Sequence, residues 1–475
     1  MTTTTPGAGS LRMMEPLRVK RLTFRNRVLR SSLGGKFAYF DGSVNNAWKS
    51  FEKRFARSGV AGLISATITV DDRRWAPVEY PRLSHDRFVA SYAAALADIK
   101  ASAPDTVYIM QIGDGGSHVQ NGLFSQPEDA KTSSAVFDLL YGYRSVGAAM
   151  TEAEIEQTIT RFAEAARRVK EVGCDGVEVT ASKGYLIHQF LNPGVNRRRD
   201  AWGGSTEKRF RLLREVATRV RERVGPDFLF GVRLSAVDYN HRPLNLRLPV
   251  TLPLRHWFTG NGLAETTWFA RELEAIGVDY LHVTSGYGFI NPMENPGDFP
   301  LKEVTVFANA SRHLSAKARL RAALLNVVPD FILRPLLGAG WRRSDGHNGR
   351  LAAEFKRVVK IPVVANGGFQ SRALIERALA EGHCDMVSMA RPLLANPDLL
   401  KVFEARDVPE RPCSFCNRCA VLTAVQAVGC YDPGRFESQD AMEDAILRWS
   451  VDPDLERRWL DAPGTRVGPP TAADG

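Results

Sequence analysis

The chain has 475 residues, of which 44% are hydrophobic and 24% charged, so it is long and apolar enough to bury a large core. Its 63 basic and 53 acidic side chains leave a net charge of +10, which suits nucleic acid, an anionic membrane or acidic cofactors without choosing among them. No apolar run reaches the roughly eighteen residues of a spanning helix, and the Thr- and Gly-rich residues 1–12 are predicted to be a disordered leader rather than a signal peptide.

Helix-like stretches alternate along the chain with short apolar runs. Several such stretches end in glycine just before a β-branched run, as at Gly173, Gly277 and Gly382. Glycine suits the left-handed end of a helix, and a short apolar run suits a strand buried on both faces. Thr151 and Glu154 form a capping-box pattern, which predicts the start of a helix.

This alternation predicts an α/β protein with eight parallel strands. The predicted strands are residues 28–33, 62–67, 108–112, 176–179, 229–234, 280–283, 362–365 and 386–388. Eight β/α units close as a (β/α)8 TIM barrel, whose active site lies at the C-terminal strand ends. A doubly wound open sheet is the alternative, but the G-x-G-x-x-G phosphate loop is absent after the first strand.

The barrel is predicted to occupy residues 13–404, with insertions at about 241–262 and 301–348. A short cysteine-bearing segment, residues 405–450, follows the barrel. Residues 451–475 are predicted to be a Pro- and Gly-rich tail.

The second insertion is basic and apolar. Residues 311–343 carry seven basic side chains against one acid, Asp330, with leucines, valines and Trp341 between them. This pattern is typical of an interfacial helix pair, and Pro329 and Pro335 interrupt it too much for a bilayer span. The sequence is compatible with a lid over the barrel, a membrane-surface contact or a docking site for an electron-transfer partner.

Polar residues mark the predicted C-terminal strand ends. Arg233 inside the fifth strand needs a fixed negative partner, either an acid or the electron-rich edge of a reduced flavin. Gln111 offers a donor and an acceptor to the same ring. Gly367 and Gly368 follow the seventh strand and Arg391 follows the eighth, in the loops that commonly bind phosphate in this fold. A simple tight turn is the alternative for the two glycines.

Four of the six cysteines crowd together in a C-x2-C-x2-C-x10-C pattern. They are Cys413, Cys416, Cys419 and Cys430. Three close thiolates and a distant fourth suit a 4Fe–4S cluster, whereas structural zinc normally uses two separated pairs. Zinc and unligated thiols are the alternatives. Cys174 and Cys384 are expected to be inert core residues, and this cysteine usage predicts a reducing, cytoplasmic location.

The order of motifs resembles the old yellow enzyme and 2,4-dienoyl-CoA reductase family. The resembling stretches are residues 26–28, 108–112, 184–193, 196–204, 232–235 and 390–400. The cysteine loop also resembles that of trimethylamine dehydrogenase. The resemblance implies a non-covalent FMN that exchanges a hydride at the barrel mouth. The implied FMN contacts are Ser31, Ser32, Ala66, Gln111, Arg233, Gly367, Gly368 and Arg391.

The chain departs from the family pattern after the fourth strand. Typical members place two imidazoles, or His and Asn, there to hold a carbonyl oxygen, and this chain has Thr180 and Lys183. A hydroxyl and an ammonium can also donate to a carbonyl or enolate oxygen, and the alternative is that Lys183 reaches into solvent. Tyr185, retained as in dienoyl-CoA reductases, is the expected proton donor, with Tyr287 as a second candidate. His188 is interpreted as structural.

Together these features predict an FMN- and 4Fe–4S-dependent NADH:flavin oxidoreductase that reduces an activated C=C bond in an enoyl or dienoyl thioester or an enone. The alternatives are a dehydrogenase that exports electrons through the cluster, and a non-catalytic electron-transfer subunit. Residues 431–475 are too few for the dinucleotide-binding region that follows the cluster in the resembling enzymes, so NAD(P)H over the flavin or a separate electron-transfer protein is expected to exchange the electrons. No nucleic-acid partner is expected. The chain is expected in the cytoplasm, and a membrane-surface contact through residues 311–343 is one of the three alternatives for that segment.

Overall fold

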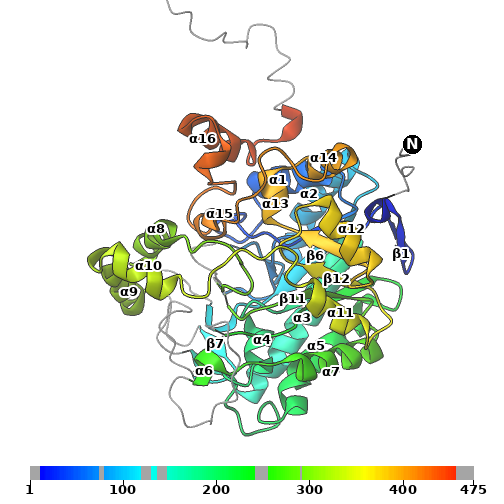
Figure 1. Cartoon of the computed structure of the whole chain (residues 1–475). Coiled ribbons are helices and arrows are strands. Elements are labelled where there is room, and N and C mark those ends of the chain that lie inside the picture. Colours follow the sequence, from blue (N-terminus) through cyan, green and yellow to red (C-terminus); the bar gives the residue numbers. More distant parts are fainter. Residues whose placement is uncertain are drawn as a thin grey trace, which may run out of the picture.

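Figure 1 shows the computed structural model of the chain, which describes residues 11–73, 80–118, 130–135, 147–240, 255–288 and 291–455. Most of the predicted leader and tail, and residues 241–254 of the first predicted insertion, lie outside the described residues. Residues 11 and 12, predicted as leader, are ordered, because the backbone N–H groups of Arg12 and Met13 donate to the Glu376 carboxylate at 3.0 and 2.9 Å.

Eight parallel strands form a closed barrel. They are β3 (Val28–Arg30), β4 (Gly62–Ile64), β6 (Val107–Gly113), β9 (Gly176–Ala181), β10 (Leu229–Ser235), β11 (Tyr280–Thr284), β12 (Val363–Asn366) and β13 (Met386–Met389). β13 pairs with β3 and β4 pairs with β6, so the sheet has no open edge among these eight strands. The (β/α)8 barrel and all eight predicted strands are therefore confirmed, and the open-sheet alternative is wrong. A short strand β5 (Ile68–Thr69) extends the pairing along β6.

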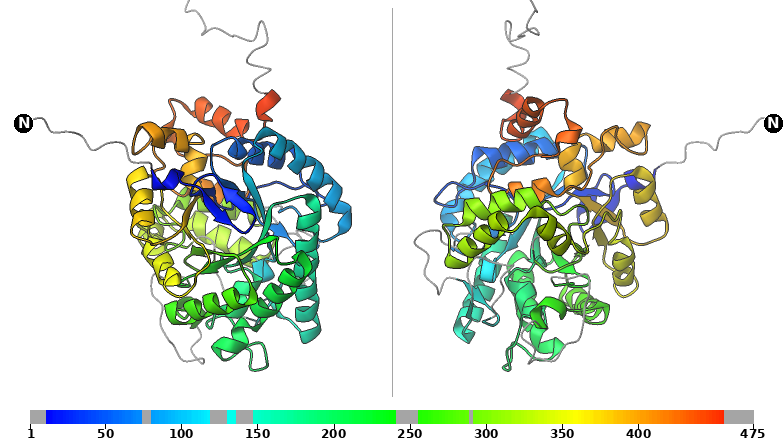
Figure 2. Two further views of the ribbon diagram at one scale, coloured as in Figure 1. Left: turned by 90° about the vertical axis from the view of Figure 1, so that its right-hand side faces the viewer. Right: turned by 60° about the vertical axis from the view of Figure 1, so that its left-hand side comes forward.

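Helices follow the strands and surround the barrel (Figure 2). The crossover helices are α1 (Asn46–Ala56), α2 (Val89–Ser102), α3 (Glu152–Val172), α5 (Thr206–Val224), α7 (Leu263–Ile276), α11 (Gly349–Lys356), α12 (Arg372–Ala380) and α14 (Leu399–Ala405). The predicted capping box opens α3, since Thr151 and Glu154 exchange side-chain and backbone hydrogen bonds. Gly173 ends the same helix at φ +92°, a left-handed conformation that glycine adopts without strain.

An antiparallel hairpin that the sequence did not predict covers the N-terminal end of the barrel. Its strands are β1 (Leu17–Val19) and β2 (Leu22–Phe24), visible at the centre of the left view in Figure 2. Val19 and Phe24 pack on apolar residues at the barrel end, among them Leu229 and Met386. This end of the barrel is closed by apolar packing, so polar chemistry is confined to the opposite end.

The second insertion forms three helices that stand out from the barrel at the left of Figure 1. They are α8 (Leu301–Ser311), α9 (Ala316–Val327) and α10 (Asp330–Leu337), and α8 packs against α9 and α15 (Arg418–Leu422). The shorter elements are α4 (Leu186–Leu191), α6 (Arg255–Phe258), α13 (Arg391–Ala395), α16 (Gln439–Arg448), β7 (Lys131–Thr132) and β8 (Ala148–Ala149). Within the described residues, none of the helices has the length and apolar character needed to cross a bilayer.

Candidate active site and cysteine pocket

A buried polar layer fills the barrel near the C-terminal strand ends. The Glu178 carboxylate accepts hydrogen bonds from Gln111 Nε2 at 2.6 Å, Tyr280 OH at 2.9 Å and His282 Nδ1 at 3.0 Å. An ionised carboxylate only accepts, so His282 carries its hydrogen on Nδ1 and its Nε2 accepts from Ser388 Oγ at 2.8 Å. Strands β6, β9, β11 and β13 thus supply one connected network.

This layer contains the negative partner that Arg233 requires. Burial raises the pKa of Glu178, but His282, Arg233 and the Gln111 amide outweigh burial, and the pKa falls below its ordinary value. Burial lowers the pKa of His282, which keeps the imidazole neutral. Burial also lowers the pKa of Arg233, and Glu178 opposes that effect. The acid and flavin interpretations of Arg233 are therefore compatible, because the negative charge of Glu178 stabilises the buried guanidinium.

The geometry around Arg233 fits an electron-rich ring. Its Nη1 donates to Ser31 Oγ at 3.4 Å, and its buried Nε has no hydrogen-bond partner in the described structure. A buried N–H of a charged group is costly unless an acceptor meets it. Gln111 Oε1 already accepts from Thr67 Oγ1 at 2.6 Å, and its amide still has one lone pair and one N–H to offer. Asn366 Nδ2 donates to Ser31 Oγ at 2.6 Å.

Tyr185 joins this arrangement through its hydroxyl. The side chain hydrogen-bonds with Thr67 and Tyr80, and burial raises the pKa of Tyr185, so the phenol keeps its proton at neutral pH. Because Thr67 also donates to Gln111, the predicted proton donor and a predicted flavin contact share one hydroxyl. The second candidate, Tyr287, instead packs its ring on His188 at a centroid distance of 4.8 Å.

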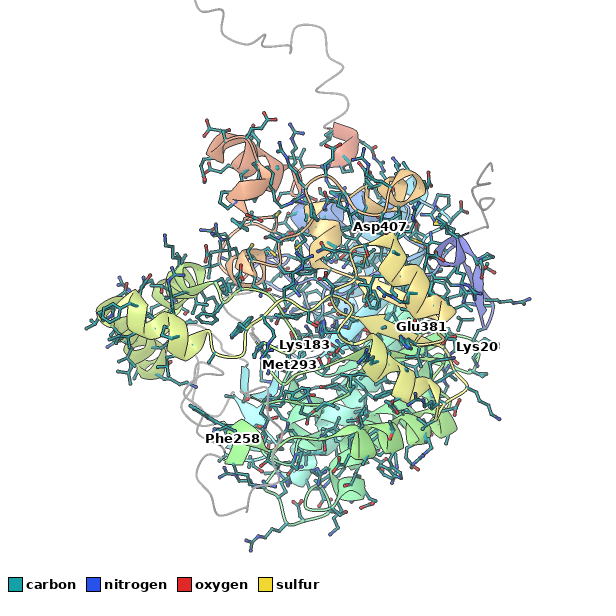
Figure 3. All side chains as sticks on the ribbon, viewed as in Figure 1. Lys20, Lys183, Phe258, Met293, Glu381 and Asp407 are labelled. Carbon is teal, nitrogen blue, oxygen red and sulfur yellow. The ribbon has the colours of Figure 1, made fainter. Side chains whose placement is uncertain are left out.

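Lys183 lies in an inward-facing turn rather than in solvent. Its backbone has φ +65°, and its ammonium forms an ion pair with the buried carboxylate of Glu294. Figure 3 shows Lys183 beside Met293, the residue before Glu294. Burial, together with the positive charges of Arg233 and Arg391, holds the pKa of Lys183 well below its usual range. The solvent-facing alternative does not describe this side chain.

His188 holds that turn in place. Its Nδ1 accepts from the backbone N–H of Gly184 at 3.0 Å, and its Nε2 donates to Asp238 at 2.8 Å. These contacts support the structural role predicted for His188. Thr180 is buried nearby on β9, with Oγ1 3.5 Å from Ser182 Oγ.

The two glycines after β12 adopt conformations that need glycine. Gly367 has φ +132° and Gly368 φ +73°. A Cβ at Gly368 would lie 2.6 Å from the Ser344 carbonyl, and one at Gly367 would lie 2.4 Å from the His347 ring. The loop therefore packs tightly against residues 344–347, the end of the second insertion. Burial lowers the pKa of His347 to about 4, so this imidazole is neutral at neutral pH.

Arg391 connects the barrel to the cysteine segment. Its Nη1 donates to the Pro296 carbonyl at 3.0 Å and to the Asn417 side-chain oxygen, and its guanidinium lies 4.8 Å from the Phe415 ring centroid. Burial lowers the pKa of Arg391, and the neighbouring thiols oppose that effect. A role toward phosphate stays a prediction, because the described contacts of Arg391 point to the cysteine segment.

All four clustered cysteines line one pocket. The other polar residues that line it are Arg391, Ser414, Asn417, Tyr431, Asp432 and Arg435, and Arg435 Nη1 lies 3.3 Å from Cys430 Sγ. Burial and the other three thiols raise the pKa of Cys419 well above its ordinary value. In the described part of the chain, no three His, Cys, Asp or Glu side chains converge closely enough to hold a metal ion. Cys174 and Cys384 are buried free cysteines, as predicted.

One loop after β11 docks this segment on the barrel. Asn417 Nδ2 donates to the carbonyls of Asn295 and Asp298 at 2.8 and 3.0 Å. Gly297 has φ +135°, and a Cβ there would lie 1.9 Å from the Phe415 carbonyl, so only glycine fits. The same loop begins with Glu294, the partner of Lys183.

Several residues of this site were not predicted from the sequence, and four of them bear directly on Arg233, Lys183 and the flavin site. These four are Glu178, His282, Glu294 and Asn366. Glu178 and His282 stand as polar residues inside the apolar strands 176–181 and 280–284, a signal that could have identified them. Glu294 lies in a loop without a motif, so the sequence offers no comparable signal.

Residues 12–246 and 340–407 match the model of the NADH:flavin oxidoreductase / NADH oxidase family. The chain belongs to this family. It is 29% identical over 402 residues to the NADH oxidase of Thermoanaerobacter brockii, covering 84% of this chain and 52% of that protein. It is 26% identical over 427 residues to the multifunctional alkene reductase/demethylase of Caballeronia cordobensis, covering 86% and 52%.

The chain thus spans about half the length of these relatives. The solved 2-naphthoyl-CoA reductase complex with 2-naphthoyl-CoA aligns with a TM-score of 0.69 at 23% identity, over 92% of this chain and 58% of that one, and shares the fold. Membership of the NADH:flavin oxidoreductase family confirms the predicted class, a flavin-dependent oxidoreductase that takes FMN.

Proposed function

We propose that the chain reduces the C=C bond of an enoyl or dienoyl thioester or an enone. The observation that carries this proposal is the hydrogen-bonded series Tyr185–Thr67–Gln111, which sets a protonated phenol beside a group suited to the flavin. The family match and the alkene reductase named among the relatives support it. A nicotinamide dinucleotide, or a separate electron-transfer protein, supplies the electrons.

The FMN ring would rest on the polar layer. The free Nε of Arg233 and the spare valences of Gln111 suit its polar edge, while Ser31, Ser32 and Ala66 follow the neighbouring strands β3 and β4. When bound, FMN supplies the hydride for the reaction. The phosphate would lie by the backbone of Gly367 and Gly368 after β12 and near Arg391 after β13, in the loops that commonly bind phosphate in this fold.

The substrate's polar group would lie between Thr180 and Lys183. Both side chains can donate to a carbonyl oxygen, and such donation stabilises negative charge that develops on that oxygen. When one alkene carbon receives the hydride, Tyr185 gives its proton to the neighbouring carbon, which leaves a saturated bond and a phenolate that solvent reprotonates. Glu294 orients the Lys183 ammonium through their ion pair.

The cysteine pocket would hold a 4Fe–4S cluster. Four thiols around one pocket and the C-x2-C-x2-C-x10-C spacing suit a cubane. Arg391 and Arg435 would offset the charge of the thiolates. Structural zinc normally uses two separated cysteine pairs, and the spacing here differs from that pattern.

The test is an anaerobic half-reaction. The dithionite-reduced protein is mixed with crotonyl-CoA or cyclohexenone in deuterated buffer while flavin absorbance is followed. We expect flavin reoxidation and a saturated product that carries solvent deuterium beside the carbonyl and, because dithionite supplies only electrons, also on the carbon that receives the hydride. Butyryl-CoA and cyclohexanone are the matched controls. If neither alkene reoxidises the flavin while a saturated substrate bleaches the oxidised protein, the dehydrogenase alternative is correct.

A further inference from the structure

Helices α9 and α10 present large apolar side chains to solvent in the described structure. These side chains form an apolar face, which comprises three residues at helical spacing on α9 and three residues on α10. Their exposed fractions are 53% for Leu320, 44% for Leu324, 79% for Val327, 76% for Phe331, 45% for Ile332 and 56% for Leu336. Val327 and Phe331 flank the turn between the two helices. Large apolar side chains gathered in this way mark an interaction site.

Helices α8, α9 and α10 form a lobe that projects away from the barrel. In Figures 1 and 3, α9 and α10 lie farthest from the barrel, and α8 lies between them and the cysteine segment. Packing of α8 on α15 and the ion pair between Arg418 and Glu303 fix the base of the lobe. The lid alternative would bury the apolar face against the barrel, and the structure instead leaves this face exposed.

Basic side chains flank the apolar face. Residues 311–343 carry seven basic residues and one acid, and that acid, Asp330, pairs with Arg334 at 3.5 Å. Arg312 and Arg319 are exposed and have no acidic partner among the described residues. A two-fold contact between copies of this chain would place these like charges against each other, which disfavours a second copy as the occupant.

We propose that the α9–α10 apolar face inserts into the surface of an anionic lipid bilayer. Val327 and Phe331 enter the acyl boundary at the tip of the lobe, while Arg312, Arg319 and Arg334 contact lipid phosphates. An amphipathic helix pair with basic flanks has the chemistry of an interfacial anchor. The anchor would hold the cysteine segment, which α8 contacts, close to the membrane surface.

The test is co-sedimentation of the full chain with vesicles of pure phosphatidylcholine or of phosphatidylcholine with phosphatidylglycerol. We expect binding only to the anionic vesicles, weakened by salt. Substitution of both Val327→Ser and Phe331→Ser should lower the partition coefficient at least about tenfold, because two large apolar side chains no longer leave water. Arg319→Glu with Arg334→Glu should also lower it at least about tenfold.

Matched controls alter similar side chains elsewhere. Leu447→Ser removes an apolar residue that is 59% exposed on α16, and Arg357→Glu reverses an exposed charge beside α11. Both should bind as the wild type does, and unchanged far-UV circular dichroism shows that each variant folds. Equal binding by the apolar double variant and the wild type, or no binding to anionic vesicles at all, overturns the proposal. A wild-type dimer that the apolar double variant splits, without vesicle binding, would identify a second copy as the occupant.

Discussion

The Glu178 carboxylate and the His282 imidazole are joined by a hydrogen bond of 3.0 Å in the barrel interior. The bond fixes the tautomer of His282, whose other nitrogen then accepts from Ser388. It also fixes a carboxylate whose negative charge offsets that of the buried Arg233 guanidinium. The floor of the site is thus preorganised by protein groups alone.

This pair should make stability depend on pH. The pKa of His282 in the folded chain lies below its ordinary 6.5, so below that pH the unfolded chain binds a proton that the folded chain does not. Glu178 has a pKa below its ordinary value of 4.5 in the folded chain. Its contribution to stability is therefore present above pH 4.5 and is lost as the pH falls through the pKa of the folded state. We expect the free energy of unfolding, measured with urea, to fall as the pH is lowered from about 7 to about 5. His282 should contribute at most about 1.4 kcal/mol per pH unit to this fall. His282→Asn should flatten this slope, and an unchanged slope would contradict the assignment.

Arg233→Met should weaken FMN binding roughly 10- to 150-fold, the range for loss of a charged hydrogen bond. The variant also leaves Glu178 with less opposing charge, so Arg233→Lys serves as a second variant that keeps the cation. FMN titration into the apoprotein, followed by flavin fluorescence, measures the effect. Arg350→Met, at an exposed arginine on α11, is the matched control. Equal affinity in the Arg233 variants and the control would leave Arg233 with a structural role only.

Tyr185→Phe should slow reoxidation of the reduced flavin by an activated alkene about 10²- to 10⁴-fold, because the general acid is lost. FMN content should not change, since the ring is retained. Stopped-flow absorbance separates the two half-reactions. Tyr287→Phe tests the second candidate, and unaltered oxidative kinetics in the Tyr185 variant would exclude Tyr185 from proton donation.

Lys183→Met should weaken substrate binding far more than FMN binding, because the ammonium is the group offered to the substrate oxygen. Equilibrium titration with a saturated thioester that does not react gives the Kd at the substrate site. The flavin content of each variant shows whether FMN binding is retained. Glu294→Gln keeps the size of the side chain that pairs with Lys183 and removes its charge. This variant should therefore lose substrate affinity too, but less than Lys183→Met does. Wild-type substrate affinity in the Lys183 variant would contradict this role.

Cys430→Ala should lower iron and acid-labile sulfide well below the predicted four per chain, while FMN stays near one per chain. Anaerobic purification with metal analysis measures both. Cys384→Ala, at a buried cysteine outside the pocket, should keep the wild-type iron content. Stoichiometric zinc without iron in the wild type would show that the pocket is not a cluster site.

The sequence predicts the barrel well because its signals are local. Each buried strand is a short apolar run, and endings such as Gly173 and the capping box at Thr151 mark the helix limits directly. The β1–β2 hairpin was missed because only one residue of each of its strands is buried, so these strands lack the continuous apolar run of a barrel strand. Burial of Arg233 was predicted correctly, but its partner Glu178 was not, because the pairing depends on which strands become neighbours.

The orientation of the second insertion could not be predicted from the sequence. A basic, apolar helix pair has the same pattern whether its apolar face turns toward the barrel or away from it. The outcome depends on where α8 docks, and that follows from its contact with α15 in a distant part of the chain. The ion pair of Lys183 also could not be predicted, because its partner Glu294 lies more than a hundred residues further along the chain.

The loop from Glu294 to Asp298 makes the two halves of the site mechanically dependent on each other. At one end it holds the Lys183 amine, and at the other it grips Asn417 between Cys416 and Cys419. Gly297 packs closely on the cysteine segment, because a Cβ at this position would overlap the Phe415 carbonyl. We therefore expect a shift of the cysteine segment to displace Glu294, the partner of Lys183, so that filling the proposed cluster site would alter affinity at the proposed substrate site without contact between the two ligands.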